Sequence, residues 1–275
     1  MTTVTMTAGA TPAGAGTGAA RAAGLPTALT PGGAQAVFRA ALDVLARPGT
    51  VRWLPSAADE PLAEHVPAAL LPLLALADLS TTTCVVDAAT GAAWDEIVRV
   101  ATNAPRAALG DARLVAALRP LSLDELSALR TGTAAAPEDG ALACLAVAGI
   151  EIVSDTAGAT GITEAVRPDV VGGAAGSDGA VGDGPGDGPG DGDDPGPGPG
   201  DGDGDGDGTR LRLRLSGPGV PGTREIVVTG LPAGFAAVRR DLVAGFPAGP
   251  DLLLIAPDGA MTGLSRTTSV NEESI

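Results

Sequence analysis

The spacing of apolar residues predicts short strands alternating with helices between residues 33 and 255. After Gly33, apolar side chains recur at intervals of three and four residues, which is the pattern of an amphipathic helix. Pro48-Gly49 then ends that helix. We expect its inward face to consist of Val37, Phe38, Ala41, Leu42 and Leu45.

Similar spacing predicts further helices, one of which opens with the capping box Ser122-Leu-Asp-Glu125. We expect helical segments at 67–77, with a kink at Pro72, and at 94–100, 122–132 and 232–244. Runs of β-branched and other apolar residues predict strands at 50–54, 81–87, 114–118, 141–148, 210–215 and 252–255.

The strand at 210–215 alternates strictly between arginine and leucine, which indicates leucines facing inward and arginines facing outward. The strand at 141–148 is apolar throughout, as expected of a strand covered on both faces. Strands alternating with helices predict an α/β domain, and we expect a mixed sheet in which these two strands pair as a hairpin.

The 275-residue chain contains two stretches that lack the apolar residues needed to order a chain. Residues 1–30 are rich in Ala, Gly and Thr, and residues 172–208 are almost wholly Gly, Asp and Pro. We expect 1–30 to be a disordered extension, 31–270 to be one domain and 271–275 to be a tail. A disordered insertion at about 155–209 would interrupt the domain without disturbing its sheet, because loop-closure entropy grows slowly with length.

The net charge of −16 is concentrated in the Gly/Asp/Pro-rich tract, which holds ten aspartates and leaves about −6 for the remainder. This acidic balance, with five aromatic residues, argues against a nucleic-acid surface, which needs basic and stacking side chains. The longest apolar run, at 66–77, is too short to span a bilayer, and no signal-peptide pattern opens the chain. We therefore expect a cytoplasmic protein that binds neither nucleic acid nor a membrane.

The chain is poor in side chains that catalyse reactions. All 17 basic residues are arginine, tyrosine is absent, and His65 is the single histidine. Schiff-base chemistry needs a lysine amine, and most general-base catalysis uses histidine. Cys84 and Cys144 lie in apolar runs without the spacing of a metal site, so we expect two buried free thiols. This composition favours a supporting role, with no metal, no cofactor and no catalytic residue.

A series of short strings runs in one order from about Gly33 to Val270, apart from the insertion. The strings are Phe38-Arg39, Ala46–Val51, Leu73–Asp78, Thr102–Pro105, Thr131–Thr133 with Pro137-Glu138, Leu213–Gly219, Phe246-Pro247 with Asp251-Leu252, and Arg266–Thr268. Their order and spacing resemble the H subunits of bacterial carbon–phosphorus lyase, the PhnH family. The chain departs from that pattern at Val100-Ala101, where the family has an aromatic-His pair, and at Ser265, where it has proline.

The resemblance implies a subunit of a complex rather than a solitary enzyme. In such systems the G, H, I and J subunits form a core that supports transfer of the ribose triphosphate moiety of ATP to an alkylphosphonate, with loss of adenine. The implied partners are the G, I and J subunits, and the chain is expected to be able to form a homodimer. The implied fold is a three-layer αβα domain like the large domain of pyridoxal-phosphate transferases, without the cofactor. A chain without lysine has no amine for the internal aldimine of that cofactor.

The candidate anion-binding residues are Arg266, Thr267 and Thr268, because a guanidinium fork and two hydroxyls suit a phosphate. The alternative is that Arg266 pairs with a carboxylate in the sheet or at an interface, with the threonines on a strand edge. The two interpretations predict different functions. The first makes the chain a component that binds phosphonate or nucleotide, and the second gives these residues a structural role.

A second group of candidates is the basic stripe formed by Arg210, Arg212 and Arg214. It is either a partner interface or a solvated edge that discourages strand pairing. The Ser216–Gly219 string is expected to be a turn that ends this strand, since it lacks the lysine and spacing of a phosphate loop. A further alternative is a divergent scaffold protein whose acidic insertion recruits a different partner.

Overall fold

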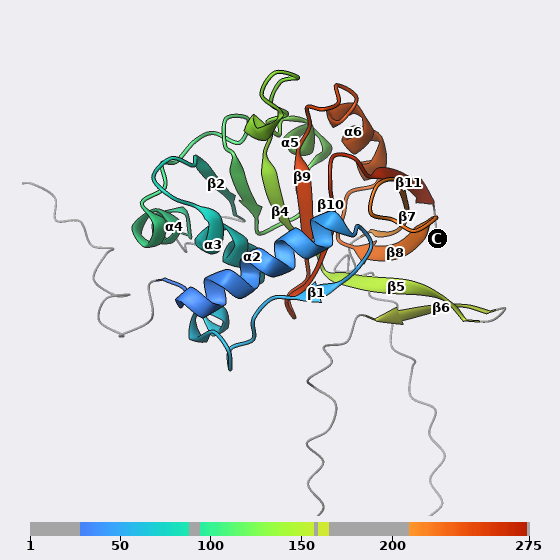
Figure 1. The fold of residues 1–275 in the computed structure, drawn as a ribbon, viewed down its shortest axis with the longest axis horizontal. Helices are drawn as coiled ribbons and strands as arrows, with labels where there is room; N and C mark the ends of the chain where they lie inside the picture. The colour runs from blue at the N-terminus through green and yellow to red at the C-terminus, as the bar shows by residue number, and fades with distance from the viewer. Residues whose placement is uncertain (1–27, 88–93, 157–158, 165–208, 274–275) are drawn as a thin grey trace, which may run out of the picture.

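The larger of two β-sheets runs through the middle of the molecule (Figure 1). The computed structural model describes residues 28–87, 94–156, 159–164 and 209–273. The six strands of the larger sheet lie in the order β1 (Arg52–Trp53), β10 (Ala260–Leu264), β9 (Asp251–Ile255), β4 (Leu142–Ala146), β3 (Leu114–Ala117) and β2 (Thr83–Val86). Strands β2, β3, β4 and β9 are parallel, whereas β10 and β1 are antiparallel to their neighbours. The predicted α/β class and mixed sheet are therefore confirmed.

A second sheet, which is wholly antiparallel, was not predicted. Its strands lie in the order β11 (Ser269–Glu273), β7 (Arg210–Ser216), β8 (Arg224–Thr229), β5 (Gly149–Thr156) and β6 (Ala159–Glu164). The predicted hairpin between 141–148 and 210–215 is wrong, because β4 pairs with β3 and β9 while β7 pairs with β8 and β11. Strand β7 alternates between exposed and buried residues, so it needs a sheet with one solvated face. Strand β4 is apolar throughout and lies in the larger sheet, which is covered on both faces.

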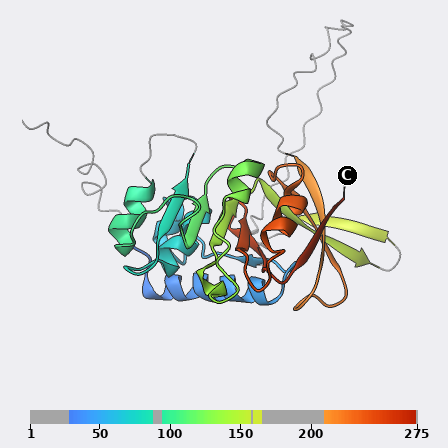
Figure 2. The same ribbon diagram turned by 90° about the horizontal axis from the view of Figure 1, so that it is seen from above.

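Helices cover one face of the larger sheet, and helices together with the second sheet cover the other face (Figure 2). On the first face lie α2 (Pro31–Ala46), η1 (Pro61–Glu64), η2 (Ala68–Leu70), α3 (Leu71–Leu76) and α4 (Trp94–Thr102). On the other face lie α5 (Leu123–Ser127) and α6 (Phe235–Leu242), and the short η3 (Pro137–Asp139) precedes β4. The third layer is thus part helix and part sheet, which differs from the expected αβα arrangement.

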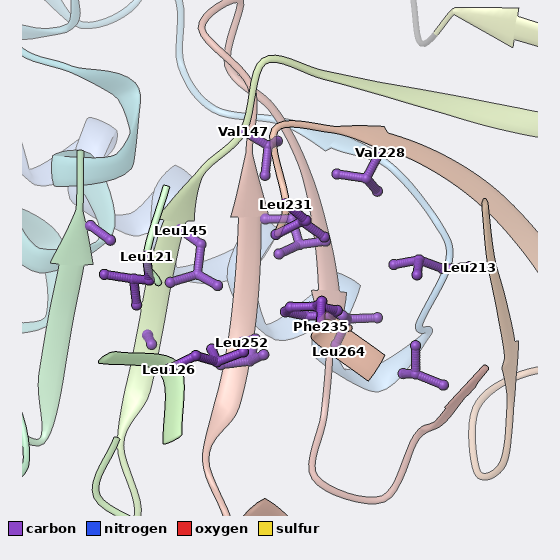
Figure 3. Packing of buried hydrophobic residues seen from close by; sticks show 14 of the residues in the cluster. Leu121, Leu126, Leu145, Val147, Leu213, Val228, Leu231, Phe235, Leu252 and Leu264 are labelled. Carbon is purple, nitrogen blue, oxygen red and sulfur yellow. The ribbon is translucent and has the colours of Figure 1, made fainter. Parts of the chain in front are cut away.

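The parallel strands send alternate side chains into two hydrophobic clusters, one on each face of the larger sheet. On β9, Leu252 and Leu254 enter one cluster, while Leu253 and Ile255 enter the other. Figure 3 shows part of the first cluster, in which Phe235 of α6 packs among leucines from both sheets. Phe235 is fully buried, and burying a side chain of this size contributes about 2–3 kcal/mol. This cluster therefore fixes the second sheet and α6 against the first sheet.

Local signals explain the ends of the predicted helices. The capping box of α5 is present, since Ser122 Oγ accepts the Glu125 N–H at 3.2 Å and Glu125 Oε2 accepts the Ser122 N–H at 2.9 Å. At the start of α2, Thr30 Oγ1 accepts the Gly33 N–H at 3.0 Å. The buried Glu60 carboxylate in turn accepts the Thr30 hydroxyl at 2.7 Å, which joins this end of α2 to η1.

The predicted orientation of α2 is wrong in part. The helix buries Val37, Ala41 and Val44, whereas Phe38 is 45% exposed and Leu42 is 51% exposed. The apolar residues of this helix span a wider arc than the sheet can cover. The centre of the buried arc therefore lies about one residue away from the predicted centre. The apolar residues at 38 and 42 are left on the outside of the helix.

Two predicted boundaries also differ from the structure. Strand β11 continues to Glu273, so the expected tail at 271–275 begins inside a strand. Strand β6 lies at Ala159–Glu164, within the range expected to be an insertion. Residues 1–27 and 165–208, which carry most of the expected disordered segments, lie outside the described residues. Within the described part of the chain, no helix is long and apolar enough to cross a membrane.

Candidate functional site

The strongest sequence candidate, Arg266, lies in the connection between β10 and β11 and pairs with Asp251 at the start of β9. Its Nη2 donates to Asp251 Oδ2 at 2.6 Å, and its Nε lies 3.2 Å from the same oxygen. Its Nη1 donates to the carbonyl oxygens of Pro137 and of Pro247, the latter at 3.4 Å. The side chain of Arg266 thus joins three connecting segments. We call Arg266, Asp251, Pro137 and Pro247 the Arg266 cluster.

The cluster contains several of the strings that the sequence singled out. Pro137 belongs to η3, Pro247 to the loop between α6 and β9, and Asp251 to the strand that follows that loop. The two loops are also joined directly, since Gly249 N–H donates to the Thr131 carbonyl at 2.7 Å. Strings scattered over 136 positions of sequence, from 131 to 266, therefore lie side by side at the amino ends of β4 and β9.

The two threonines after Arg266 differ in exposure. Thr268 is buried and Thr267 is exposed, and each hydroxyl lies 3.0 Å from the Ser265 hydroxyl. The Thr268 N–H donates to the Ser265 carbonyl at 2.8 Å, which closes a turn. Both hydroxyls of the predicted anion-binding set thus contact Ser265 within the turn, and Thr267 is also exposed to solvent.

A second arginine at this site, Arg239 of α6, was missed by sequence reasoning. Its side chain is buried, and its Nη2 donates to the carbonyls of Ser265 at 2.5 Å and Leu264 at 3.3 Å. Its Nε has no hydrogen-bond partner among the described residues. Burial lowers the pKa of Arg239 to about 10, and the Asp251 carboxylate nearby opposes that shift. The signal was present in the sequence, because Arg239 lies four residues after Phe235 and three before Leu242, on the apolar face of the helix.

The Ser216–Gly219 string is a packing turn, as expected. A β-carbon at Gly217, where φ is +121°, would lie 2.7 Å from the carbonyl oxygen of Thr267. A β-carbon at Gly219, where φ is +79°, would lie 2.1 Å from the carbonyl oxygen of Ala46. These glycines therefore let the turn fit between the Arg266–Thr268 segment and the end of α2.

The three arginines of β7 lie on the outer face of the second sheet, and each of them pairs with a glutamate. Arg210 pairs with Glu151 at 2.5 Å, and Arg214 pairs with Glu225 at 2.8 Å and with Glu273 at 3.5 Å. Arg212 lies 3.6 Å from Glu225. Because β7 lies between β11 and β8, the interpretation of this stripe as a sheet edge is wrong.

The two cysteines and the single histidine lie on separate elements: Cys84 on β2, Cys144 on β4 and His65 at the end of η1. Cys84 and Cys144 are free, and burial raises the pKa of both thiols. Cys144 is buried as expected, whereas Cys84 is only partly buried. His65 lies exposed at the end of η1. Within the described ranges, His, Cys, Asp and Glu form no group of three or more that is arranged to hold a metal ion.

Comparison with protein families identifies the chain over most of its length. A family model described as bacterial phosphonate metabolism protein (PhnH) matches residues 28–165 and 204–271. The matched ranges contain the Arg266 cluster and every string that suggested the resemblance, and they omit most of the Gly/Asp/Pro-rich tract. No curated protein matches the chain. The chain therefore belongs to the PhnH family of bacterial phosphonate metabolism proteins.

Proposed function

We propose that this chain is the H-type subunit of a carbon–phosphorus lyase core complex, with no reaction of its own. In that role it supports transfer of the ribose triphosphate moiety of ATP to an alkylphosphonate, with loss of adenine, and assembles with the G, I and J subunits. Membership of the PhnH family carries the proposal. The family places the chain in phosphonate metabolism, and the complex is where an H subunit acts.

The contacts of the Arg266 cluster support a structural role for its residues. A guanidinium that binds substrate needs free donors, but Arg266 directs its donors to one carboxylate and two carbonyls of its own chain. Its function in this proposal is to hold three loops in fixed positions at one end of the larger sheet. Such preorganised loops suit a protein interface, because little ordering is left for the moment of binding.

The expected kinship with the large domain of pyridoxal-phosphate transferases stays a prediction. The composition limits what such kinship would mean, since a chain without lysine cannot hold that cofactor as an internal aldimine. A fold of this ancestry would here serve as a scaffold.

One observation favours a second candidate function, the binding of an anion at Arg266–Thr268. Arg239 and Arg266 both lie near the single carboxylate of Asp251, and Thr267 leaves one hydroxyl exposed beside them. The two guanidinium groups together exceed the charge of that carboxylate by one. Calorimetry with ATP and with methylphosphonate tests this candidate, using Arg266→Ala for comparison. Binding that is absent, or unchanged in the variant, excludes it.

Co-expression with the G, I and J subunits, followed by affinity purification and native mass spectrometry, tests the main proposal. We expect one stable assembly that contains all four proteins. A parallel assay of the purified chain with ATP and an alkylphosphonate should show no turnover. Assembly of the other three subunits without this chain, or turnover by the chain alone, would overturn the proposal.

A further inference from the structure

Helix α2 carries more apolar surface than the fold buries. Val37, Ala41 and Val44 pack against the larger sheet, while Phe38 and Leu42 project from the outside of the helix. Side chains four positions apart are neighbours on a helix surface, so Phe38 and Leu42 form one continuous apolar area. In Figure 2 this helix lies along one border of the molecule, outside the larger sheet.

This pair stands out from the other exposed apolar residues. Among the described residues the large exposed hydrophobic side chains are Phe38, Leu42, Leu79, Val100 and Phe246. Phe38 and Leu42 share a helix, whereas each of the others lies on a different element or loop. Single exposed apolar residues need no explanation, but an aromatic and a leucine side by side are typical of an interface.

The charges beside this pair have one dominant sign. Arg39 is exposed, and no carboxylate of the described residues pairs with it. One turn further along, Asp43 pairs with Arg47 and with Arg52, the latter at 2.5 Å. Arg47 and Arg52 contact Asp43, and with the nearby Arg39 these four residues carry a formal charge of +2 on a chain whose net charge is −16.

We propose that Phe38, Arg39 and Leu42, which we call the α2 face, form a docking site for an apolar segment of another subunit bordered by acidic residues. The two apolar side chains would supply the buried anchors, and Arg39 would select a partner of opposite charge. The charge argues against a second copy of the chain as the occupant, because two α2 faces would bring two positive surfaces together. The inference rests on the proposed function, since it takes the partner from the G, I and J subunits.

Two variants of this surface test the inference in the full co-expressed complex. Each is compared with a matched control variant elsewhere on the chain. Phe38→Ser with Leu42→Ser removes the apolar anchors, and Val100→Ser removes a comparably exposed apolar side chain on α4. Arg39→Glu reverses a charge of the α2 face, and Arg240→Glu does the same at an exposed arginine of α6. All five residues are at the surface, so circular dichroism and thermal melting should match the unsubstituted chain.

We expect the Phe38/Leu42 double variant to be recovered with the complex at least about tenfold less than the unsubstituted chain, the effect of losing anchor residues. Arg39→Glu should weaken assembly more at low salt than at high salt, and both control variants should assemble normally. Normal assembly of the double variant would overturn the docking site and leave the proposed function intact. Failure of the unsubstituted chain to assemble would overturn the proposed function and with it this partner. A homodimer that the double variant disrupts would identify a second copy as the occupant and would also overturn the inference.

Discussion

The guanidinium of Arg266 and the carboxylate of Asp251 form an ion pair that joins the β10–β11 connection to the first residue of β9. Asp251 Oδ1 also accepts the backbone N–H of Arg266 at 2.7 Å, so both the side chain and the backbone of the arginine are fixed by one carboxylate. The two side chains are only 19% and 22% exposed, which limits screening of the pair by water. This pair is therefore the main polar link between the loops at this end of the sheet.

Asp251→Ala should lower the free energy of unfolding by about 2–4 kcal/mol, because it leaves two poorly solvated guanidinium groups without a nearby counter-ion. Arg266→Lys should be destabilising as well, since one ammonium cannot reach the carboxylate and both proline carbonyls at once. Urea unfolding followed by circular dichroism measures both effects. Arg214→Ala, which removes an exposed ion pair of β7, is the control and should change the midpoint little. A loss in the control as large as that of Asp251→Ala would show that the pair has no special role.

The carboxylate of Glu272 on β11 caps helix α6. It accepts the Gly234 N–H at 3.1 Å and the Ala236 N–H at 3.2 Å, two donors that the helix itself cannot satisfy. Glu272→Ala should therefore cost about 1 kcal/mol of stability, the usual effect of losing a cap near a positive helix end. Glu273→Ala is a matched control on the same strand, because that side chain points to the outer face and pairs with Arg214. Thermal unfolding of the two variants should separate them, and equal midpoints would refute the capping role.

The Arg119–Glu125 pair predicts a specific change of stability in acid. The Arg119 guanidinium, helped by the Ser122 N–H, lowers the pKa of Glu125 from 4.5 to about 2. A carboxyl whose pKa is lower in the folded state stabilises the fold above its unfolded pKa and loses that effect as the pH falls toward the folded value. The difference in stability between the unsubstituted chain and Glu125→Gln should be constant above about pH 5 and should vanish near pH 2. We expect at most about 1 kcal/mol, since the pair is partly exposed, and a difference that does not depend on pH would contradict this assignment.

Hydrophobic periodicity predicted the larger sheet better than the second one. Strands β3, β4 and β9 are short apolar runs buried on both faces, and such runs are visible in sequence without any knowledge of their neighbours. Strand β10 was missed because Ala260–Leu264 includes glycine, alanine and methionine, which have little preference for strands. Strand β5 alternates at Ile150-Glu151-Ile152 and β8 carries the β-branched run Ile226–Val228, but neither strand was predicted.

At the candidate site, the sequence could indicate the key residue but not the residues that it contacts. Arg266 could be selected from sequence as a residue of interest, but its partners Pro137, Pro247 and Asp251 come from three separate segments that only the fold brings together. The orientation of α2 could not be fixed for a related reason. Val37, Phe38, Ala41 and Leu42 span an arc wider than one face of the sheet covers, and packing decides which of them is left outside.

Arg239 provides the last prediction, since it is a buried cation that hydrogen bonds only to carbonyls. Burial of a charged guanidinium opposes folding, while its two hydrogen bonds to the β10–β11 connection favour it. Arg239→Met keeps much of the side-chain volume and removes both effects, so the free energy of unfolding at neutral pH should change by less than about 1 kcal/mol. Arg239→Ala should lose more than about 2 kcal/mol, because it also leaves a cavity under α6.

The pKa of Arg239 makes the comparison with Arg239→Met depend on pH. Its folded value of about 10 lies below the ordinary value of 12.5, so the unfolded chain binds more protons between these values. The stability of the unsubstituted chain relative to Arg239→Met should therefore rise from about pH 10 to pH 12. Alkaline titration is simple to interpret in this protein, because it has no lysine and no tyrosine, and the two cysteines are common to both chains. Urea unfolding at several pH values measures the difference, and a flat or falling profile would show that the arginine is not held in a desolvated, charged state.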